Sequence, residues 1–166
     1  VRNGNATMVD ADGALKWAPH NLLRYSEQFD NAAWSKNNVT VTANATTAPD
    51  GTSTAAQISA TSTTDATFID SPGIPARGGV QYKQKVYVKA GTLNFVAVSA
   101  RWGGQAPTRT WFDLSTGVRT SGTDAEISDE GNGWYLLTLT DTGARTAPCR
   151  LFVVNGDSEI ASSALG

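Results

Sequence analysis

Arginine and tryptophan side chains are concentrated in one short stretch of the chain. It holds five side chains of the kinds that bind sugars: Arg101, Trp102, Gln105, Arg109 and Trp111. An aromatic face packs against the apolar side of a pyranose ring, and planar polar groups pair with neighbouring hydroxyls. Gly103 and Gly104 predict a turn between two strands, which brings both ends of the stretch together. We therefore expect the two arginines and the two tryptophans to form a glycan-binding surface; packing at the rim and in the core is the alternative.

A strand next to this stretch offers one further aromatic side chain. Residues 80–89 alternate between apolar and polar types and predict the longest strand of the chain. One face carries Val80, Tyr82, Val86 and Val88, interrupted only by Gln84, and the other carries Lys83, Lys85, Tyr87 and Lys89. We include Tyr87 as an outlying contributor to the glycan-binding surface, with a solvated polar face as the alternative.

Groups that could perform catalysis are sparse. The only histidine, His20, has no Ser or Cys motif beside it, and no G-x-S-x-G element occurs. Glycoside hydrolysis needs two carboxylates roughly 5 to 10 Å apart. Acidic residues cluster at Asp124, Glu126, Asp129 and Glu130, but in a strand and turn where carboxylates are usually solvated. We expect a protein that is not an enzyme.

Motifs for a metal or cofactor are equally weak. Residues 10–13 (DADG) begin like a calcium loop, but Ala14 and Asn21 stand where an EF-hand needs an oxygen ligand and a bidentate Glu. We expect no cofactor, although a jelly roll holding structural Ca²⁺ through backbone carbonyls stays open. The one cysteine, Cys149, excludes an internal disulfide and is expected to be a small buried side chain.

Composition restricts the class of protein. A chain of 166 residues suits one domain with a real core, and 40% hydrophobic with 17% charged residues argues against a disordered tail. The formal net charge of -2 gives no bulk attraction to nucleic acid or to anionic membranes. No apolar run reaches the roughly 18 residues of a membrane span, so we expect no membrane insertion.

Turn signals at short intervals predict an all-β fold. No segment of a dozen residues keeps a helical repeat. Strands are expected at 39–43, 55–60 (or a single helical turn), 80–89, 94–102, 109–113, 118–120, 125–129, 134–140 and 150–155. Roughly ten short strands of this kind indicate a jelly roll or β-sandwich of two antiparallel sheets.

Two further expectations concern the first part of the chain. Residues 1–20 predict a lead-in hairpin or connector, with an Asp-Gly turn between 8–9 and 15–17, and residues 21–166 a single β-sandwich domain. Trp17 in the lead-in is a candidate contact with a neighbouring subunit or domain. The segment 21–34 is expected to build the first core strands, with Tyr25, Phe29 and Trp34 buried, and Trp134 is expected in the core.

Six sequence blocks follow one another in a fixed order. They are 10–13 (DADG), 21–34 (NLLRYSEQFDNAAW), 48–52 (APDGT), 87–91 (YVKAG), 111–117 (WFDLSTG) and 131–135 (GNGWY). In this order they resemble an all-β domain that recurs in bacteriophage tail-fibre and head-fibre (head spike) proteins, over about residues 7 to 155. The resemblance implies a jelly roll, similar to carbohydrate-binding modules, on a virion protein that binds host-surface glycans. Many family members continue into one further strand, whereas this chain turns polar after Asn155.

These observations together favour a non-enzymatic virion module of the fibre or spike type, facing the host surface. Its expected partners are a host-surface polysaccharide and other virion proteins, and copies in a homo-oligomer would supply avidity. One alternative is a purely structural capsid-decoration or head-fibre domain that binds no sugar. A second is a carbohydrate-binding module attached to a polysaccharide-degrading enzyme. A third, an enzyme in its own right, would need a carboxylate pair facing a groove.

Overall fold

Strands, turns and loops make up all of the protein that can be described. The computed structural model describes residues 7–9, 11–17, 21–74, 81–92, 94–100, 109–122, 125–141, 149–154 and 164–165. The strands are β1 Thr7–Val9, β2 Leu15–Trp17, β3 Ser35–Asn37, β4 Val39–Thr46, β5 Ala55–Ala60, β6 Phe68–Asp70, β7 Tyr82–Lys89, β8 Phe95–Ala100, β9 Thr110–Asp113, β10 Val118–Ser121, β11 Ala125–Gly131, β12 Trp134–Asp141, β13 Cys149–Val154 and β14 Ala164–Leu165. None of these residues is helical, so they include no helix that could span a membrane.

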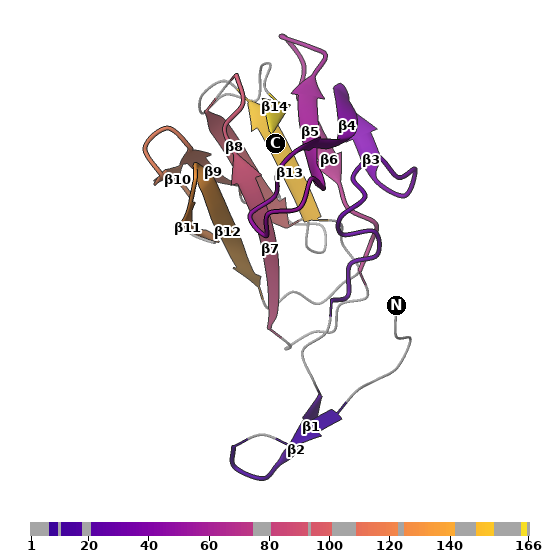
Figure 1. Cartoon of the computed structure of the whole chain (residues 1–166), viewed down its shortest axis with the longest axis vertical. Coiled ribbons are helices and arrows are strands. Elements are labelled where there is room, and N and C mark those ends of the chain that lie inside the picture. The colour runs from indigo at the N-terminus through magenta and orange to yellow at the C-terminus, as the bar shows by residue number, and fades with distance from the viewer. Residues whose placement is uncertain are drawn as a thin grey trace.

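The strands form a β-sandwich (Figure 1). One layer is a six-stranded sheet in the order β10-β9-β8-β13-β6-β3. The opposite layer consists of two three-stranded sheets, β11-β12-β7 and β14-β5-β4. All the strand pairs are antiparallel. The all-β sandwich is therefore confirmed, and the jelly-roll winding stays a prediction.

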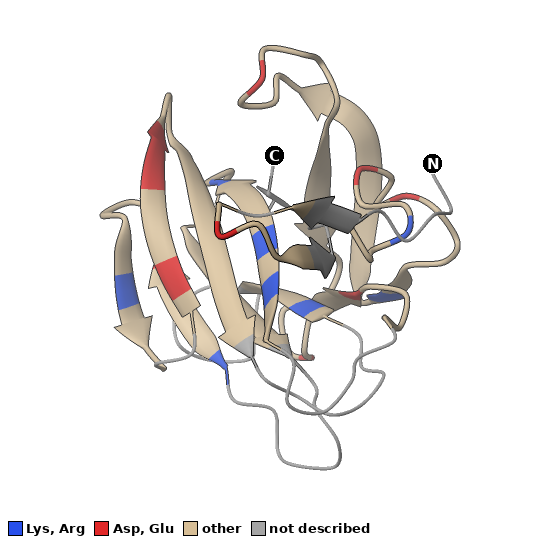
Figure 2. Ribbon diagram, turned by 90° about the horizontal axis from the view of Figure 1, so that it is seen from below, with Lys and Arg blue, Asp and Glu red and all other residues tan. Residues whose placement is uncertain are grey.

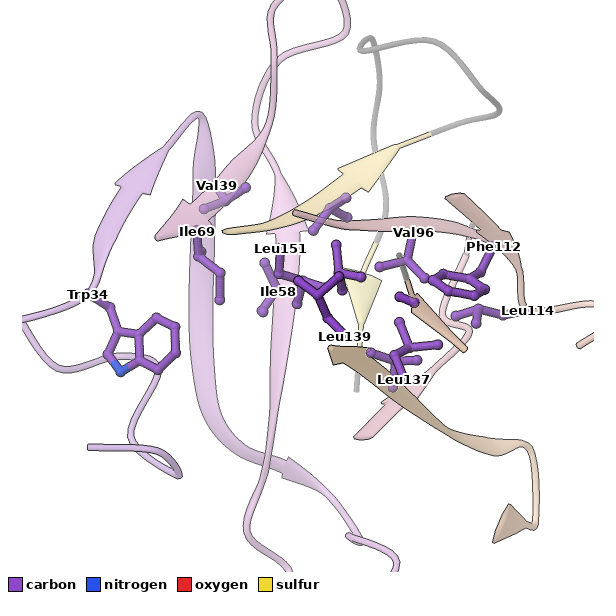
Figure 3. Packing of buried hydrophobic residues seen from close by; sticks show 14 residues of the cluster. Trp34, Val39, Ile58, Ile69, Val96, Phe112, Leu114, Leu137, Leu139 and Leu151 are labelled. Carbon is purple, nitrogen blue, oxygen red and sulfur yellow. The ribbon is translucent and has the colours of Figure 1, made fainter. Parts of the chain in front are cut away.

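A single hydrophobic cluster fills the space between the layers. The six-stranded sheet contributes Ile69, Val96, Val98, Phe112, Leu151 and Val153, and the opposite layer contributes Val39, Ile58, Val88, Ala125, Leu137 and Leu139. Trp34 lies at one end of the cluster, with Phe112 and Leu114 at the other (Figure 3). Each fully buried Val, Leu, Ile or Phe side chain of the cluster stabilises the fold by ~1.5–3 kcal/mol relative to an exposed position. The cluster thus joins three sheets into one body.

The strands predicted from alternation agree well with those observed. β7 buries Tyr82, Gln84, Val86 and Val88 more deeply than the lysines between them, while Val80 lies outside the described residues. β8 is apolar on both faces, as expected of a central strand, with Val96 and Val98 in the main cluster and Ala97 in a second one. Residues 55–60 form a strand and not a helical turn.

The lead-in hairpin is also confirmed. β1 pairs with β2 so that Thr7 faces Trp17, Met8 faces Lys16 and Val9 faces Leu15. Gly13 turns the chain at a φ of 76°, which only glycine adopts at no steric cost. The hairpin stands apart from the sandwich (Figure 1). Whether residues 1–20 and 21–166 are separate units stays a prediction.

The segment 21–34 forms a loop, so the prediction that it builds core strands is wrong. The side chains of Asn21 and Asn31 accept hydrogen bonds of 2.9 Å from the backbone N–H groups of Leu23 and Ala33. Such local bonds compete with pairing in a sheet. The sequence therefore favours a chain of turns here.

One buried ring anchors this loop. Trp34 is buried as predicted, and its indole Nε1 donates a 2.9 Å hydrogen bond to the carbonyl of Tyr25. Phe29 packs on Trp34 with ring centroids 4.8 Å apart. Tyr25 has a φ of 57° and is 48% exposed, so its predicted place in the core is wrong. Its backbone carbonyl, and not its ring, supports the core.

Two glycines with positive φ provide a test of packing behind the β10–β11 turn. A Cβ at Gly122 would collide with the carbonyl oxygen of Arg109 and lie 2.7 Å from Thr110 Cα, whereas a Cβ at Gly51 would meet nothing within 4 Å. Both alanine variants place a Cβ at a positive φ, and this strain costs each of them about 1–2 kcal/mol of stability. We expect Gly122→Ala to lose a further ~1–3 kcal/mol through the clash. Urea unfolding measures both, and equal losses would contradict the packing described.

Candidate functional site

The five residues predicted to bind glycan do not form one surface among the described residues. Arg101 and Trp102 lie outside those residues. Arg109 and Trp111 lie at the start of β9 in the six-stranded sheet, and Tyr87 lies on β7 in the opposite layer. Trp111 is only 7% exposed. The glycan-binding role of all five residues stays a prediction, but Arg109–Trp111 and Tyr87 belong to different layers.

Arg109 and Trp111 belong to a larger set of side chains, which we call the arginine–aromatic face. It covers the outer side of the six-stranded sheet and consists of Phe68, Asp70, Phe95, Arg109, Trp111, Arg150 and Phe152. The Trp111 and Phe152 ring centroids are 6.3 Å apart. Phe152 is fully buried, so the rings of this face chiefly pack against one another.

Two guanidinium groups lie over these rings. Arg109 lies 4.6 Å from the centroid of Phe152, and Arg150 lies 3.5 Å from the centroid of Phe68. Arg150 also forms a bidentate pair with Asp70, with both N–O distances at 2.6 Å. Burial, and then the neighbouring Arg150 charge, lower the pKa of Arg109. The arginine–aromatic face thus contains one carboxylate, that of Asp70, and two guanidinium groups. The planar guanidinium and aromatic groups are held in a rigid array.

Tyr87 lines a groove of about 1030 Å³ in the opposite layer. The groove is bounded by the loop 21–34, by the β4–β5 turn with the beginning of β5, and by Gln81 with residues 82–88 of β7. No described strand pairs with the second edge of β7, because the order of its sheet ends there. The groove exists because the two three-stranded sheets of this layer do not join along β7.

The floor and the rim of the groove differ in chemistry. Core residues including Ile69, Leu139 and Leu151 reach the floor. The rim carries Asn21, Glu27, Asp50, Lys83, Lys85 and Glu130. Charges of both signs are interspersed over the described part of the chain (Figure 2). Tyr87 stands among these polar groups with 49% of its surface exposed.

Local hydrogen bonds fix the polar groups at two parts of this rim. Asn21 donates to Ser26 Oγ at 2.9 Å. Asp50 accepts from the Thr52 hydroxyl at 2.7 Å and from the Thr52 N–H at 2.9 Å. These bonds, that of the hydroxyl first, lower the pKa of Asp50. Asp50 is therefore an ionised acceptor at neutral pH, which suits hydroxyl recognition and not general-acid catalysis.

Trp134 is buried as predicted, and it also lines the groove. It pairs across the sheet with Lys89, whose Nζ lies 6.0 Å from the ring centroid. Lys89 in turn donates a 2.8 Å hydrogen bond to the Asn132 carbonyl in the turn after β11. This end of the groove is consequently rigid.

Of the acidic residues that were expected to be solvated, those within the described ranges are exposed. Glu126, Asp129 and Glu130 are exposed, and Asp124 lies outside the described residues. Within the described ranges, no group of three His, Cys, Asp or Glu side chains is arranged to hold a metal ion. Asp10 and His20 also lie outside those ranges.

Several site residues could not be found by reading the sequence. Asp70 and Arg150 are far apart along the chain, and only the pairing of β6 with β13 brings them together. Glu27 and Asp50 lie in turns, and no sequence pattern indicated that these two turns border the same groove. The one usable signal was the alternation in β7, which predicted that Tyr87 is exposed.

Comparison with known proteins adds no relative: no family model matches the chain, and no curated protein is similar to it.

The Asp70–Arg150 pair provides a test of the arginine–aromatic face. Its two side chains are 13% and 12% exposed, so Asp70→Asn leaves a nearly buried guanidinium without its anion. We expect Asp70→Asn to lose about 2–4 kcal/mol of the free energy of unfolding. Glu126→Gln removes an exposed carboxylate and is the matched control, with an expected change within ~0.5 kcal/mol. Equal effects in urea unfolding would contradict a structural ion pair.

Cys149 is buried as predicted, and its burial makes the stability of the fold depend on pH. Burial raises the pKa of its thiol to about 11, against an ordinary value of about 8.5. The folded state thus prefers the protonated thiol, and this contribution to stability is complete below pH ~8.5 and lost as the pH rises towards 11. We expect Cys149→Ala to reduce the loss of stability between pH 8.5 and 11 in urea unfolding. An unchanged pH dependence would contradict the buried thiol.

Proposed function

We propose that the protein is a non-enzymatic module that binds an extended glycan in the groove beside Tyr87. The observation that carries the proposal is an exposed tyrosine in a long groove whose rim holds amide, carboxylate and ammonium groups. Aromatic faces and polar groups in this combination match the alternating apolar and hydroxyl faces of a sugar chain. Asn21 and Asp50, fixed by local bonds, lose little entropy on binding a hydroxyl.

We further propose that the module is part of a phage fibre or spike that faces the host surface. The sequence blocks that resemble fibre domains support this assignment, and the β-sandwich is compatible with it. A single site of this kind binds weakly, so repeated copies would supply the affinity needed for attachment. Other virion proteins would be its remaining partners.

A glycan array on the purified chain, followed by calorimetry with the best ligand, tests the proposal. We expect Tyr87→Ala to weaken binding about tenfold, which corresponds to ~1.4 kcal/mol for a lost ring contact. Val118→Ala removes an exposed apolar side chain that does not line the groove and should bind like the wild type. Circular dichroism checks that both variants fold.

A third variant separates the two candidate surfaces. If Arg109→Ala weakens binding and Tyr87→Ala does not, the glycan binds on the arginine–aromatic face, and the groove assignment is wrong. If the wild-type chain binds no glycan on the array, the purely structural role is favoured and the proposed function fails.

A further inference from the structure

The charged side chains that line the groove are sorted by sign between its two walls. One wall is β7, which carries Lys83 and Lys85 and no acidic residue. The other is formed by the loop and the β4–β5 turn opposite β7. It carries Glu27 and Asp50 and, among the described residues that line it, no lysine or arginine. We call them the lysine wall and the carboxylate wall. The remaining charged lining residue, Glu130, belongs to β11 and to neither wall.

The protein does not neutralise the charges of these walls itself. Within the described part of the chain, none of the four side chains takes part in an ion pair. Lys83 and Lys85 face the uncharged Thr140 and Thr138 on β12. All four charged side chains are exposed. The groove therefore keeps opposite charges apart and leaves both signs accessible to a ligand.

This arrangement restricts the charge of a ligand that fills the groove. A neutral sugar chain would displace water from four ions and return no opposite charge to them. A purely acidic chain would meet the carboxylate wall, and a purely basic chain would meet the lysine wall, and like charges brought together weaken binding. A chain that carries both signs pairs with each wall without such repulsion.

We propose that the groove selects a zwitterionic glycan, whose acidic groups contact the lysine wall and whose ammonium groups contact the carboxylate wall. This specificity rests on the proposed glycan-binding function and adds the chemical class of the ligand to it. Lys85 lies two positions before Tyr87, so both side chains belong to the same face of β7. An acidic sugar that pairs with Lys85 is consequently placed beside the exposed tyrosine ring.

Calorimetry with four forms of one sugar chain tests the charge requirement. The parent oligosaccharide alternates glucuronic acid with glucosamine and carries both signs. N-acetylation removes its positive charges, carboxyl reduction removes its negative charges, and both treatments together give a neutral chain. We expect the parent to bind about fivefold more tightly than either singly charged form, which is the gain from one exposed ion pair. This preference should shrink as the salt concentration rises. A parent chain that binds no more tightly than the other three forms would overturn the proposal.

Variants that remove one charge assign the role of each wall. Lys85→Gln should weaken binding of the parent about fivefold and leave binding of the carboxyl-reduced form unchanged. Glu27→Gln should weaken binding of the parent and leave that of the N-acetylated form unchanged. Arg24→Gln and Glu126→Gln are the matched controls, because each removes an exposed charge that does not line the groove, and both should bind like the wild type. Equal effects of Lys85→Gln on the parent and the carboxyl-reduced form would contradict the lysine wall.

The glycan array separates failure of this proposal from failure of the proposed function. If the chain binds glycans and those bound most tightly lack either charge, the zwitterionic specificity is wrong and the glycan-binding function stands. If the chain binds no glycan, the proposed function fails and the specificity fails with it.

Discussion

The packing of β13 on both of its faces is the constraint on which the rest of the structure depends. This strand pairs with β8 on one side and with β6 on the other. Leu151 and Val153 belong to the main core, while Arg150 and Phe152 belong to the arginine–aromatic face. Val153 also exchanges hydrogen bonds with Thr67 through its N–H and its carbonyl. A change in the register of β13 would exchange the core with the outer face.

This two-sided packing explains why the protein carries so many buried rings outside its main core. A sheet with a solvated outer face would alternate apolar and polar residues along each strand. In β13 and β9 the outer positions instead include Arg150, Phe152 and Trp111, because rings and guanidinium groups stack upon one another there. Trp111 is thus engaged in packing, whereas Tyr87 on the opposite layer is an exposed aromatic residue that lines the groove.

The sequence allowed the strands to be predicted because their signal is local. The alternation in β7 and the Asn-Gly turn before β12 depend on neighbouring residues only, and both gave the observed elements. The loop 21–34 was misjudged because spaced aromatic residues resemble a strand pattern, whereas Asn21 and Asn31 bond to the backbone beside them. Burial of Tyr25 likewise could not be judged, since its position depends on where the Trp34 ring packs.

The candidate site was less predictable because it depends on contacts between distant segments. Arg109 and Trp111 were found together since they are close in sequence, but Asp70 and Phe68 join them only through the sheet order. The groove arises where two sheets fail to meet along β7, and no local pattern records such a gap. Tyr87 could be placed on an exposed face, but the loop and turn opposite to it could not.

The central position of β13 has a consequence for synthesis of the chain. Asp70 and its partner Arg150 are 80 residues apart, so β6 and β3 leave the ribosome long before the strand that joins them to β8. Until then, the edge of β6 that later pairs with β13 has no neighbouring strand. The inner side of β6, including Ile69, is therefore not covered from that edge. Closing so long a loop is slow, and exposed apolar edges favour aggregation. We expect the sandwich to form late, with the nascent chain dependent on protection from aggregation until residue 154 has emerged.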